Sequence, residues 1–445
     1  MYHINHTSIM RRIISHTIFS VVMAICGFIQ VSATTPLEAR NDSLVNSHKF
    51  IFFGEGDNPH ADSVRRLIMD FYVDQFRHFQ DPEAPYFLFM SKDASLAMGI
   101  GGVVRLRSWT DWGGSVNSTA FAPYLIPIPK DPVHDKDFGT TPAGTSLFFR
   151  VIGRNRKLGN YQLYIQAQFS GYAHEDFKLK KAYAQINDWT VGLATSTFSD
   201  AAAEPPTVDA NGSNVSMDQS AVLVRWMHVW KNRWRVAASL ETPAMSIDTD
   251  GVNTAARSQF LPNVAALVQY QWGYNQHVQL AGIMRSLPYR DLLTEKNYNT
   301  IGWGVQLSTV LNIAGPLTFY GITTYGKGYA SYSGDMLMGN YDMVPDPELP
   351  GRLYAPRAVT FMSGLQYHFN PMLFVSATFG QSRYLPGKAV DPTEYKYGQF
   401  YCANVIWNLT PRISMGAEFD LGKRQNFNGD HRWARRFSAM AQFSF

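Results

Sequence analysis

The chain has 445 residues, with 39 lysines and arginines against 35 aspartates and glutamates, for a formal net charge of +4 at pH 7. This near balance excludes a typical nucleic-acid-binding protein, in which a basic surface dominates. Aromatic residues make up 14% of the chain and glycine occurs 34 times, a composition that favours a large antiparallel β structure over an α/β enzyme.

The first 33 residues have the three parts of a secretory signal peptide. Arg11 and Arg12 precede the apolar run 18–29, and the small-residue site Val31-Ser32-Ala33 follows it. The run is shorter than the roughly 20 apolar residues that a membrane-spanning helix needs, and no later stretch has that length and apolarity. We therefore predict export, with residues 1–33 as the signal peptide.

Residues 34–93 are predicted to form a periplasmic extension with one amphipathic helix at residues 59–80. Apolar side chains recur there at three- to four-residue spacing, for example at Leu67 and Phe71. Pro82 would end the helix. Three roles stay open: a lid on the periplasmic mouth of a channel, a helix that assembles with copies of itself, or a packed appendage without a role in transport.

From residue 94 to residue 445 the chain falls into 16 segments in which apolar and polar residues alternate. In the first segment, Val104 and Leu106 share one face, whereas Arg105 and Arg107 share the other. Most segments have about 10–14 residues, which suits a tilted membrane-spanning strand and exceeds the usual soluble strand. The segments lie near residues 94–109, 144–155, 160–171, 177–187, 189–198, 220–230, 233–243, 261–272, 276–286, 298–312, 317–328, 358–369, 372–383, 398–408, 411–422 and 432–445.

The connections alternate between tight turns, such as Asn370-Pro371, and mostly long loops, such as 110–143 and 329–357. This alternation is typical of outer-membrane barrels, which have short periplasmic turns and long external loops. The sequence therefore predicts an all-β fold. It is a 16-stranded antiparallel transmembrane β-barrel at residues 94–445 with a short N-terminal helical extension, in the outer membrane of a Gram-negative-type envelope.

The sequence contains no G-x-S-x-G elbow, no phosphate-binding loop, no H-E-x-x-H and no C-x-x-C pair. Asp248-Thr249-Asp250-Gly251 resembles part of a calcium loop but lacks the later glutamate ligand. We therefore expect no catalytic residues, no cofactor and no metal. Cys402 would be the only cysteine of the mature chain, so no intramolecular disulfide is expected. It falls on the inward face, and no role is assigned to it.

The inward face supplies the candidate functional residues, because the alternation separates lipid-facing from water-facing side chains. Basic residues outnumber acidic ones there, and rings of arginine and lysine favour the passage of anions. The alternative is that the arginines pair with carboxylates and only stiffen the barrel. The predicted pore-lining residues are Arg105, Arg107, Arg150, Arg154, Lys181, Arg225, Arg235, Glu241, Arg285, Glu418, Asp420 and Arg436.

The connection at residues 199–219 is the predicted constriction loop. Two adjacent prolines stiffen it, which would help a loop that folds into the lumen and opposes a basic wall. The alternative is an ordinary surface loop. Its candidate residues are Asp200, Glu204, Pro205, Pro206, Asp209 and Gly212.

Several short motifs stand in and around this loop. They are FKLKKAY at 177–183, GLATSTFSD at 192–200, PTVD at 206–209 with Gly212, VRW at 224–226, and GGVVRL at 101–106. In these motifs the chain resembles the DcaP-like family of trimeric outer-membrane porins. The resemblance implies a 16-stranded barrel, homotrimers, an inward-folded third loop and uptake of small, often anionic, solutes. The chain departs from the family in having Lys180 and Lys181 where arginine is usual, and in a helix shorter than a coiled-coil stalk.

The sequence therefore predicts a porin for passive diffusion of small hydrophilic, anionic solutes. One alternative is a substrate-specific channel for organic acids or other nutrients, and another is a structural or adhesion barrel with a blocked lumen. Phe443 and Phe445 in the last segment are the predicted signal for the barrel assembly machinery. The expected partners are outer-membrane lipid, two further copies of the chain, that machinery and small-molecule solutes, with no nucleic acid.

Overall fold

The computed structural model describes residues 48–72, 74–116, 118–169, 176–215, 219–243, 245–273 and 275–445. The predicted signal peptide, residues 1–33, and the first part of the extension lie outside the described residues. None of the helices in these ranges is long and apolar enough to cross a membrane.

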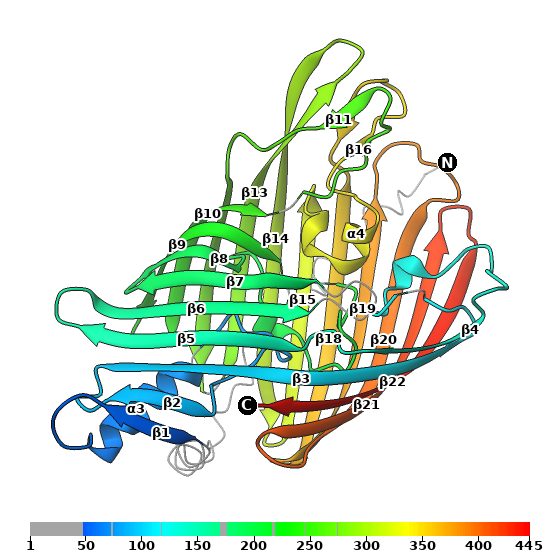
Figure 1. Cartoon of the computed structure of the whole chain (residues 1–445). Coiled ribbons are helices and arrows are strands. Elements are labelled where there is room, and N and C mark those ends of the chain that lie inside the picture. The colour runs from blue at the N-terminus through cyan, green and yellow to red at the C-terminus, as the bar shows by residue number, and fades with distance from the viewer. Residues whose placement is uncertain are drawn as a thin grey trace, which may run out of the picture. The chain divides into compact units, whose positions relative to one another are not determined.

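Sixteen long strands form a closed antiparallel barrel, in which each strand pairs with the next along the chain and the last pairs with the first (Figure 1). This arrangement confirms the predicted fold, and the strands match the predicted segments one for one. The barrel strands are β3 (Leu96–Trp112), β5 (Ser146–Asn155), β6 (Gly159–Phe169), β7 (Phe177–Ile186), β8 (Trp189–Thr195), β9 (Ser220–Trp230), β10 (Trp234–Pro243), β12 (Asn263–Trp272), β13 (Gln276–Asp291), β14 (Lys296–Ala314), β15 (Leu317–Lys327), β18 (Arg357–Asn370), β19 (Leu373–Leu385), β20 (Tyr395–Asn408), β21 (Ile413–Asn426) and β22 (His431–Ser444).

The barrel closes where β22 meets β3. The ladder runs from the pair Arg435 and Trp112 to the pair Ser444 and Val103. One residue further, the backbone N–H of Phe445 donates to the carbonyl of Gly102 and the N–H of Gly102 donates to the carbonyl of Phe445, each at 3.0 Å. The C-terminal residue therefore takes part in the closing ladder, which leaves no free strand edge in the hydrocarbon region.

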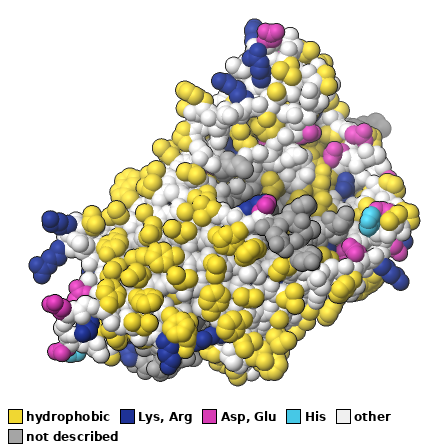
Figure 2. Space-filling model, in the orientation of Figure 1, with side chains coloured by type: hydrophobic (Ala, Val, Ile, Leu, Met, Phe, Trp, Pro, Cys, Tyr) yellow, Lys and Arg dark blue, Asp and Glu magenta, His cyan; other side chains and the backbone are white. Residues whose placement is uncertain are grey.

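Side chains on the barrel strands alternate between exposed and buried positions, as predicted. On β3, Val104 and Leu106 are exposed, while Arg105 and Arg107 are each only 4% exposed. Figure 2 shows hydrophobic side chains gathered over the wall formed by β5 to β9. The outer face is thus apolar and suits lipid, and the buried charged residues of the strands, such as Arg105 and Arg107, point inward.

Long loops on one rim carry the remaining short elements, and several of them pack inside the barrel. Phe198, Tyr332 and Met336 from two of these loops form a core with Ala281 and Ile283 of β13. The loop elements are β4 (Lys136–Thr141), β11 (Thr254–Ala256), β16 (Val344–Pro345), β17 (Leu353–Tyr354), α4 (Gly334–Met338), and the 3₁₀ turns η1 (Pro123–Leu125), η2 (Ala201–Ala203) and η3 (Ala330–Tyr332).

The N-terminal extension forms a small unit beside the start of β3 (Figure 1). Strand β1 (Lys49–Phe53) lies parallel to β2 (Phe87–Ser91), which pairs antiparallel with β3. Helix α3 (Ala61–Tyr72) covers this sheet, because Leu67, Ile68 and Phe71 pack with Leu88 and Met90. The two short strands were not predicted, since each has only five residues and little polar alternation.

The predicted helix at residues 59–80 is too long. It begins at Ala61 and ends at Tyr72, and residues 74–80 are not helical. The side chain of Asp74 accepts a hydrogen bond from the N–H of Phe76 at 3.0 Å, a local bond that competes with helix formation. Phe76 instead contacts Arg225 of the barrel wall, so its four-residue spacing from Tyr72 misled the prediction.

The closing seam gives a first prediction, which concerns Gly102. A Cβ atom at this position would lie 2.5 Å from the carbonyl oxygen of Ser146 and 2.8 Å from the ring of Phe445. We expect Gly102→Ala to destabilise the folded barrel by about 1–3 kcal/mol, the usual cost of overpacking. The measurement is the urea concentration at which the heat-modifiable folded band is lost.

Gly282→Ala on β13 is the matched control, because the nearest atom to its Cβ would be the carbonyl oxygen of Gly304 at 3.9 Å. This variant should keep the wild-type midpoint or exceed it slightly, since alanine reduces the entropy of the unfolded chain. Equal midpoints for the two variants would contradict the role given to the seam.

Candidate functional site

A polar cavity of 190 Å³ lies inside the barrel, where the N-terminal extension, the loop after β8 and the strands β3 and β7 meet. It has room for several water molecules. Cationic side chains outnumber carboxylates in its wall. Its charged and amide lining residues are His78, Gln80, Arg105, Arg107, Lys180 and Glu204.

Arg105 and Arg107 project into this cavity from neighbouring inward positions of β3. Arg105 donates from Nε and Nη2 to the side-chain oxygen of Gln442 at 3.0 and 2.9 Å. It also donates to the backbone oxygen of Gln80 at 2.8 Å. Arg107 donates to the carbonyl of Ala143 at 3.0 Å and to the side-chain oxygen of Gln80. All of these acceptors are neutral, so they hold the guanidinium groups without cancelling their charge.

Arg225 on β9 is a third arginine of this kind. It donates to the carbonyl of Thr195 at 3.0 Å, and its guanidinium carbon lies 3.8 Å from the ring centroid of Phe76. Within the described part of the chain, Arg105, Arg107 and Arg225 form no ion pair. Buried cations that face neutral partners keep a positive potential in the space beside them.

Lys180 and Lys181 are adjacent on β7, yet both contact Asp81 of the extension. Their Nζ atoms lie 2.6 and 2.9 Å from its carboxylate oxygens. Neighbouring residues on a regular strand point to opposite faces, but a β-bulge interrupts the pairing with β6 between Gln166 and Ala167. The bulge gives Lys180 no partner on β6 and turns its side chain inward. Sequence alternation predicted Lys181 at the pore but missed Lys180 for this reason.

Asp81 lies outside the barrel strands, and its side chain is only 4% exposed. Burial opposes ionisation of this carboxyl, but the charges of Lys180 and Lys181 outweigh burial and hold its pKa well below the usual range. Asp81 therefore stays ionised at any pH near neutrality. The cavity wall thus binds one carboxylate already, and that carboxylate belongs to the chain itself.

Two predicted pore-lining arginines are ion-paired, which corrects the expectation that they face solute. Arg285 is paired with Asp342 at 2.5 Å, and both side chains are fully buried. Arg436 is paired with Asp111 at 2.7 Å, directly across the closing seam. The alternative that arginines pair structurally with carboxylates therefore holds for these two. Sequence alternation shows whether a side chain points inward or outward, but it does not show which residue will be its ion-pair partner.

Three other predicted basic residues lie away from the cavity wall. Arg150 is buried and donates to the side chain of Gln162 at 3.0 Å and to the carbonyl of Phe71 in α3. Arg154 is exposed, and Arg235 is partly buried. Arg150 thus fastens the extension to the barrel.

The predicted acidic residues do not line open water either. Glu241 accepts hydrogen bonds from the hydroxyls of Ser196 at 2.6 Å and Tyr332 at 3.0 Å. Glu418 accepts from the backbone N–H groups of Val208 at 2.7 Å and Asp209 at 2.6 Å. These two carboxylates anchor inward-folded loops. Asp420 is fully buried, and neither of its oxygens has a hydrogen-bond partner among the described residues.

The predicted constriction loop at residues 199–219, here named the crossing loop, is described at residues 199–215 and 219. This part of the loop crosses the interior of the barrel. Asp200 binds Nε2 of His277 on β13 at 2.9 Å. Burial opposes ionisation of Asp200, but the adjacent His277 lowers its pKa. On the opposite side, the carbonyl of Pro206 accepts from the side chain of Asn404 on β20 at 2.8 Å.

The same loop also meets the wall and the extension at other predicted residues. Pro205 lies over β18, where a Cβ on Gly364 would come within 2.9 Å of its ring. Glu204 pairs with His78 at 3.0 Å, and the carboxylate of Asp209 accepts from the N–H of Phe121 at 2.9 Å. Gly212 has a positive φ of 65°, which suits its tight turn. The three acidic side chains in the described part of this loop, Asp200, Glu204 and Asp209, are therefore each held by a partner.

One group in the described chain could hold a metal ion. Ligand atoms of Cys402, Glu418 and Asp420 all lie within 4.8 Å of one another and are buried. Both oxygens of Glu418 already accept hydrogen bonds from the crossing loop. We assign no ion to this group.

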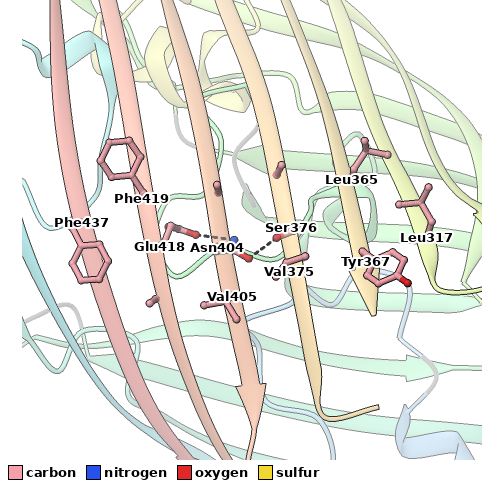
Figure 3. A pocket seen from close by; sticks show the side chains of 13 residues that line it. Leu317, Leu365, Tyr367, Val375, Ser376, Asn404, Val405, Glu418, Phe419 and Phe437 are labelled. Atoms are coloured by element: carbon pink, nitrogen blue, oxygen red, sulfur yellow. Dashed lines mark hydrogen bonds between the residues drawn. The ribbon is translucent and has the colours of Figure 1, made fainter. Parts of the chain in front are cut away.

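A larger hollow of 540 Å³ lies on the outer wall over β15 to β22 (Figure 3). Its exposed rim includes Val405, Phe419 and Phe437. Figure 3 shows Ser376, Asn404 and Glu418 joined by hydrogen bonds on these strands. Because its rim is apolar and faces outward, this hollow belongs to the lipid-facing surface and not to the solute path.

The comparisons with known proteins agree with this geometry. The family model of the DcaP outer membrane protein matches residues 91–445. The outer membrane channel DcaP of Acinetobacter baumannii has a crystal structure that is 19% identical and superposes with a TM-score of 0.66, over 79% of this chain and 98% of that one. An anion-selective porin from Comamonas acidovorans is 12% identical with a TM-score of 0.51, over 79% and 100% of the two chains. Comparison with curated proteins gave no match.

The anchoring of the crossing loop gives a second prediction, which concerns Glu418. Glu418→Gln would place an amide N–H₂ against one of the two backbone donors, Val208 or Asp209. Leaving a buried donor without an acceptor costs about 1–3 kcal/mol, so exchange of these amides with D₂O should become roughly fivefold faster or more. Hydrogen–deuterium exchange of the peptide that contains residues 208–209 measures it.

Glu348→Gln is the control, because that side chain is 72% exposed and its ion-pair partner is Lys388, which is not part of the crossing loop. It should leave the exchange of the same peptide unchanged. Equal rates for the two variants and the wild type would show that Glu418 does not hold the loop.

Proposed function

The chain belongs to the DcaP outer membrane protein family and is a porin of the outer membrane, and from this premise we propose that it lets small hydrophilic anions diffuse through its lumen. The observation that carries the proposal is the cationic wall of the inner cavity. Arg105, Arg107 and Arg225 face neutral acceptors, and Lys180 and Lys181 stand beside them.

Fixed cations in a narrow, low-dielectric path attract anions and repel cations, because few water molecules are present to screen them. Nε of Arg107 and Nε of Arg225 are buried donors without a partner among the described residues. These nitrogen atoms are enclosed, so the two guanidinium groups act on a passing anion through their charge. The driving force would be the concentration gradient of the solute.

We propose further that the loop at residues 199–219 forms the constriction. Its support is its position between β8, β13 and β20, together with the hydrogen bonds that fix Asp200 and Pro206. A loop held at both sides can set the width of the path opposite the cationic wall. Anion selectivity is also a property of the Comamonas acidovorans porin, with which this chain shares the fold.

A channel specific for organic acids is the second candidate. It is favoured by one observation, namely that Lys180 and Lys181 bind a carboxylate, that of Asp81. We infer no enzymatic activity, because the chain shares its fold with a channel and a porin.

Selectivity gives a third prediction. If the arginines set the potential of the path, replacing Arg105, Arg107 and Arg225 together by glutamine should shift the reversal potential in a KCl gradient toward cations. Glutamine keeps much of the size and the hydrogen bonding, while the charge is lost. Planar bilayers with the purified protein provide the measurement.

A matched control removes three charges from the exposed residues Arg66, Arg156 and Arg257. It should leave the anion-to-cation permeability ratio unchanged. If the lumen variant kept the wild-type ratio too, the arginines would be structural and the proposed anion preference would be wrong.

Assembly in the membrane forms part of the proposal. We expect a homotrimer embedded in outer-membrane lipid, as the family resemblance implies. We also expect the barrel assembly machinery to recognise the last strand. Its support is that Phe443 is 44% exposed on the outer face and that Phe445 pairs with Gly102.

The oligomeric state gives a fourth prediction. Native mass spectrometry in mild detergent should detect particles of three chains, because a trimer hides part of the apolar outer wall from detergent and is stable there. Heating the same sample should give the mass of one chain. If only single chains were detected in several mild detergents before heating, the prediction of a trimer would be wrong, whereas the barrel fold would not be affected.

A further inference from the structure

Residues 74–83, here named the inner segment, leave the end of α3, enter the barrel and return to β2. His48 holds the two ends of this excursion together. Its Nδ1 donates to the carbonyl of Pro85, and the hydroxyl of Tyr72 donates to its Nε2, both at 2.8 Å. Burial lowers the pKa of His48, which keeps the ring neutral and suits this pair of bonds. The inner segment is therefore tethered at a fixed base.

Inside the barrel the inner segment binds the same cations that we propose for the solute path. The ring of Phe76 lies under the guanidinium of Arg225, and its carbonyl accepts from Nζ of Lys181 at 3.3 Å. Gln80 accepts from both Arg105 and Arg107. Each of these contacts therefore engages a cationic side chain of the proposed path.

The inner segment also binds the crossing loop on its other side. The side-chain amide of Gln80 donates to the carbonyls of Thr207 at 3.1 Å and Asp209 at 2.6 Å. His78 pairs with Glu204 at 3.0 Å. The segment thus bridges the cationic wall and the loop that we propose as the constriction, which places it within the path itself.

Asp81 presents a carboxylate to the two adjacent lysines of β7. Its two oxygens contact Lys180 and Lys181 at 2.6 and 2.9 Å, and the group is almost fully buried. Because the inner segment is joined to the barrel at both ends, its local concentration is high and it competes strongly with a free anion.

We propose that the inner segment is a tethered plug that closes the anion path at rest, with the carboxylate of Asp81 as an internal competitor for the solute site. This inference rests on the proposed function. Conduction then requires the segment to leave Lys180 and Lys181. The apparent affinity for a solute is then the intrinsic affinity multiplied by the fraction of molecules in which the plug is undocked.

The fifth prediction tests the plug with Asp81→Asn. Asparagine keeps the size but removes the charge, so Lys180 and the buried Lys181 lose their ion pairs with this carboxylate and docking weakens. We expect the undocked fraction to rise about tenfold or more, which corresponds to a loss of about 1.4 kcal/mol or more in docking. In planar bilayers the mean conductance per molecule should rise with it.

Trypsin gives a second readout that does not depend on conduction. Arg77 lies within the inner segment, so cleavage after it requires the segment to leave the lumen. The Asp81→Asn protein should release a fragment that begins at His78, while the wild-type protein resists. Asp81→Glu, which keeps the charge, should resist as well. The double variant Lys180→Gln and Lys181→Gln removes the barrel's half of the same ion pairs and should also release the segment. It provides the test if the first variant does not fold.

Asp62→Asn is the matched control, because it removes the same charge from α3, where the side chain is 86% exposed. It should conduct and resist trypsin like the wild type. The plug would be overturned if Asp81→Asn and the double lysine variant, both folded, matched the wild type in conductance and cleavage. It would also be overturned if wild-type Arg77 were cut as fast as in the variants.

The two proposals fail separately. An unplugged variant without anion preference would disprove the proposed anion channel and support the plug. An anion-selective wild type that is open and insensitive to Asp81→Asn would support the channel and disprove the plug.

Discussion

The closed hydrogen-bonded ladder is the constraint on which the rest of this structure depends. In the hydrocarbon region no water can satisfy a backbone N–H or carbonyl, so the first and last barrel strands must pair. They do so from Trp112 and Arg435 down to Gly102 and Phe445. The closing ladder also fixes register, because a shift of one residue would turn every arginine of β3 toward lipid.

Closure creates a second problem, since it gathers many charged side chains inside one narrow space. The protein satisfies them in three ways. Arg285 and Arg436 take buried carboxylates as partners. Glu418 accepts from backbone N–H groups of the crossing loop. Arg105, Arg107 and Arg225 take neutral acceptors, so their charges contribute a positive field in the lumen. Structural and selective roles of the inward charges therefore separate by their partners.

The N-terminal extension contacts both the closed barrel and the charged residues inside it. Its small sheet continues from β3, and Arg150 of β5 binds the last turn of α3. From that base the chain reaches the lysines of β7, where a β-bulge has turned Lys180 inward beside Lys181. A bulge of one residue thus doubles the local charge and matches it to one carboxylate, that of Asp81.

The sequence by itself determined the barrel, its strand number and the facing of its side chains, because alternation and loop lengths depend only on local order. It also indicated which loop carries two stiffening prolines. Only the tertiary structure decided which inward charges are paired, since Asp342 and Asp81 are distant in sequence from Arg285 and Lys181. The end of α3 at Tyr72 and the inward turn of Lys180 were not predicted either. The first is followed by the hydrogen bond between Asp74 and Phe76, and the second results from the β-bulge in the pairing of β7 with β6; apolar periodicity along one segment contains neither.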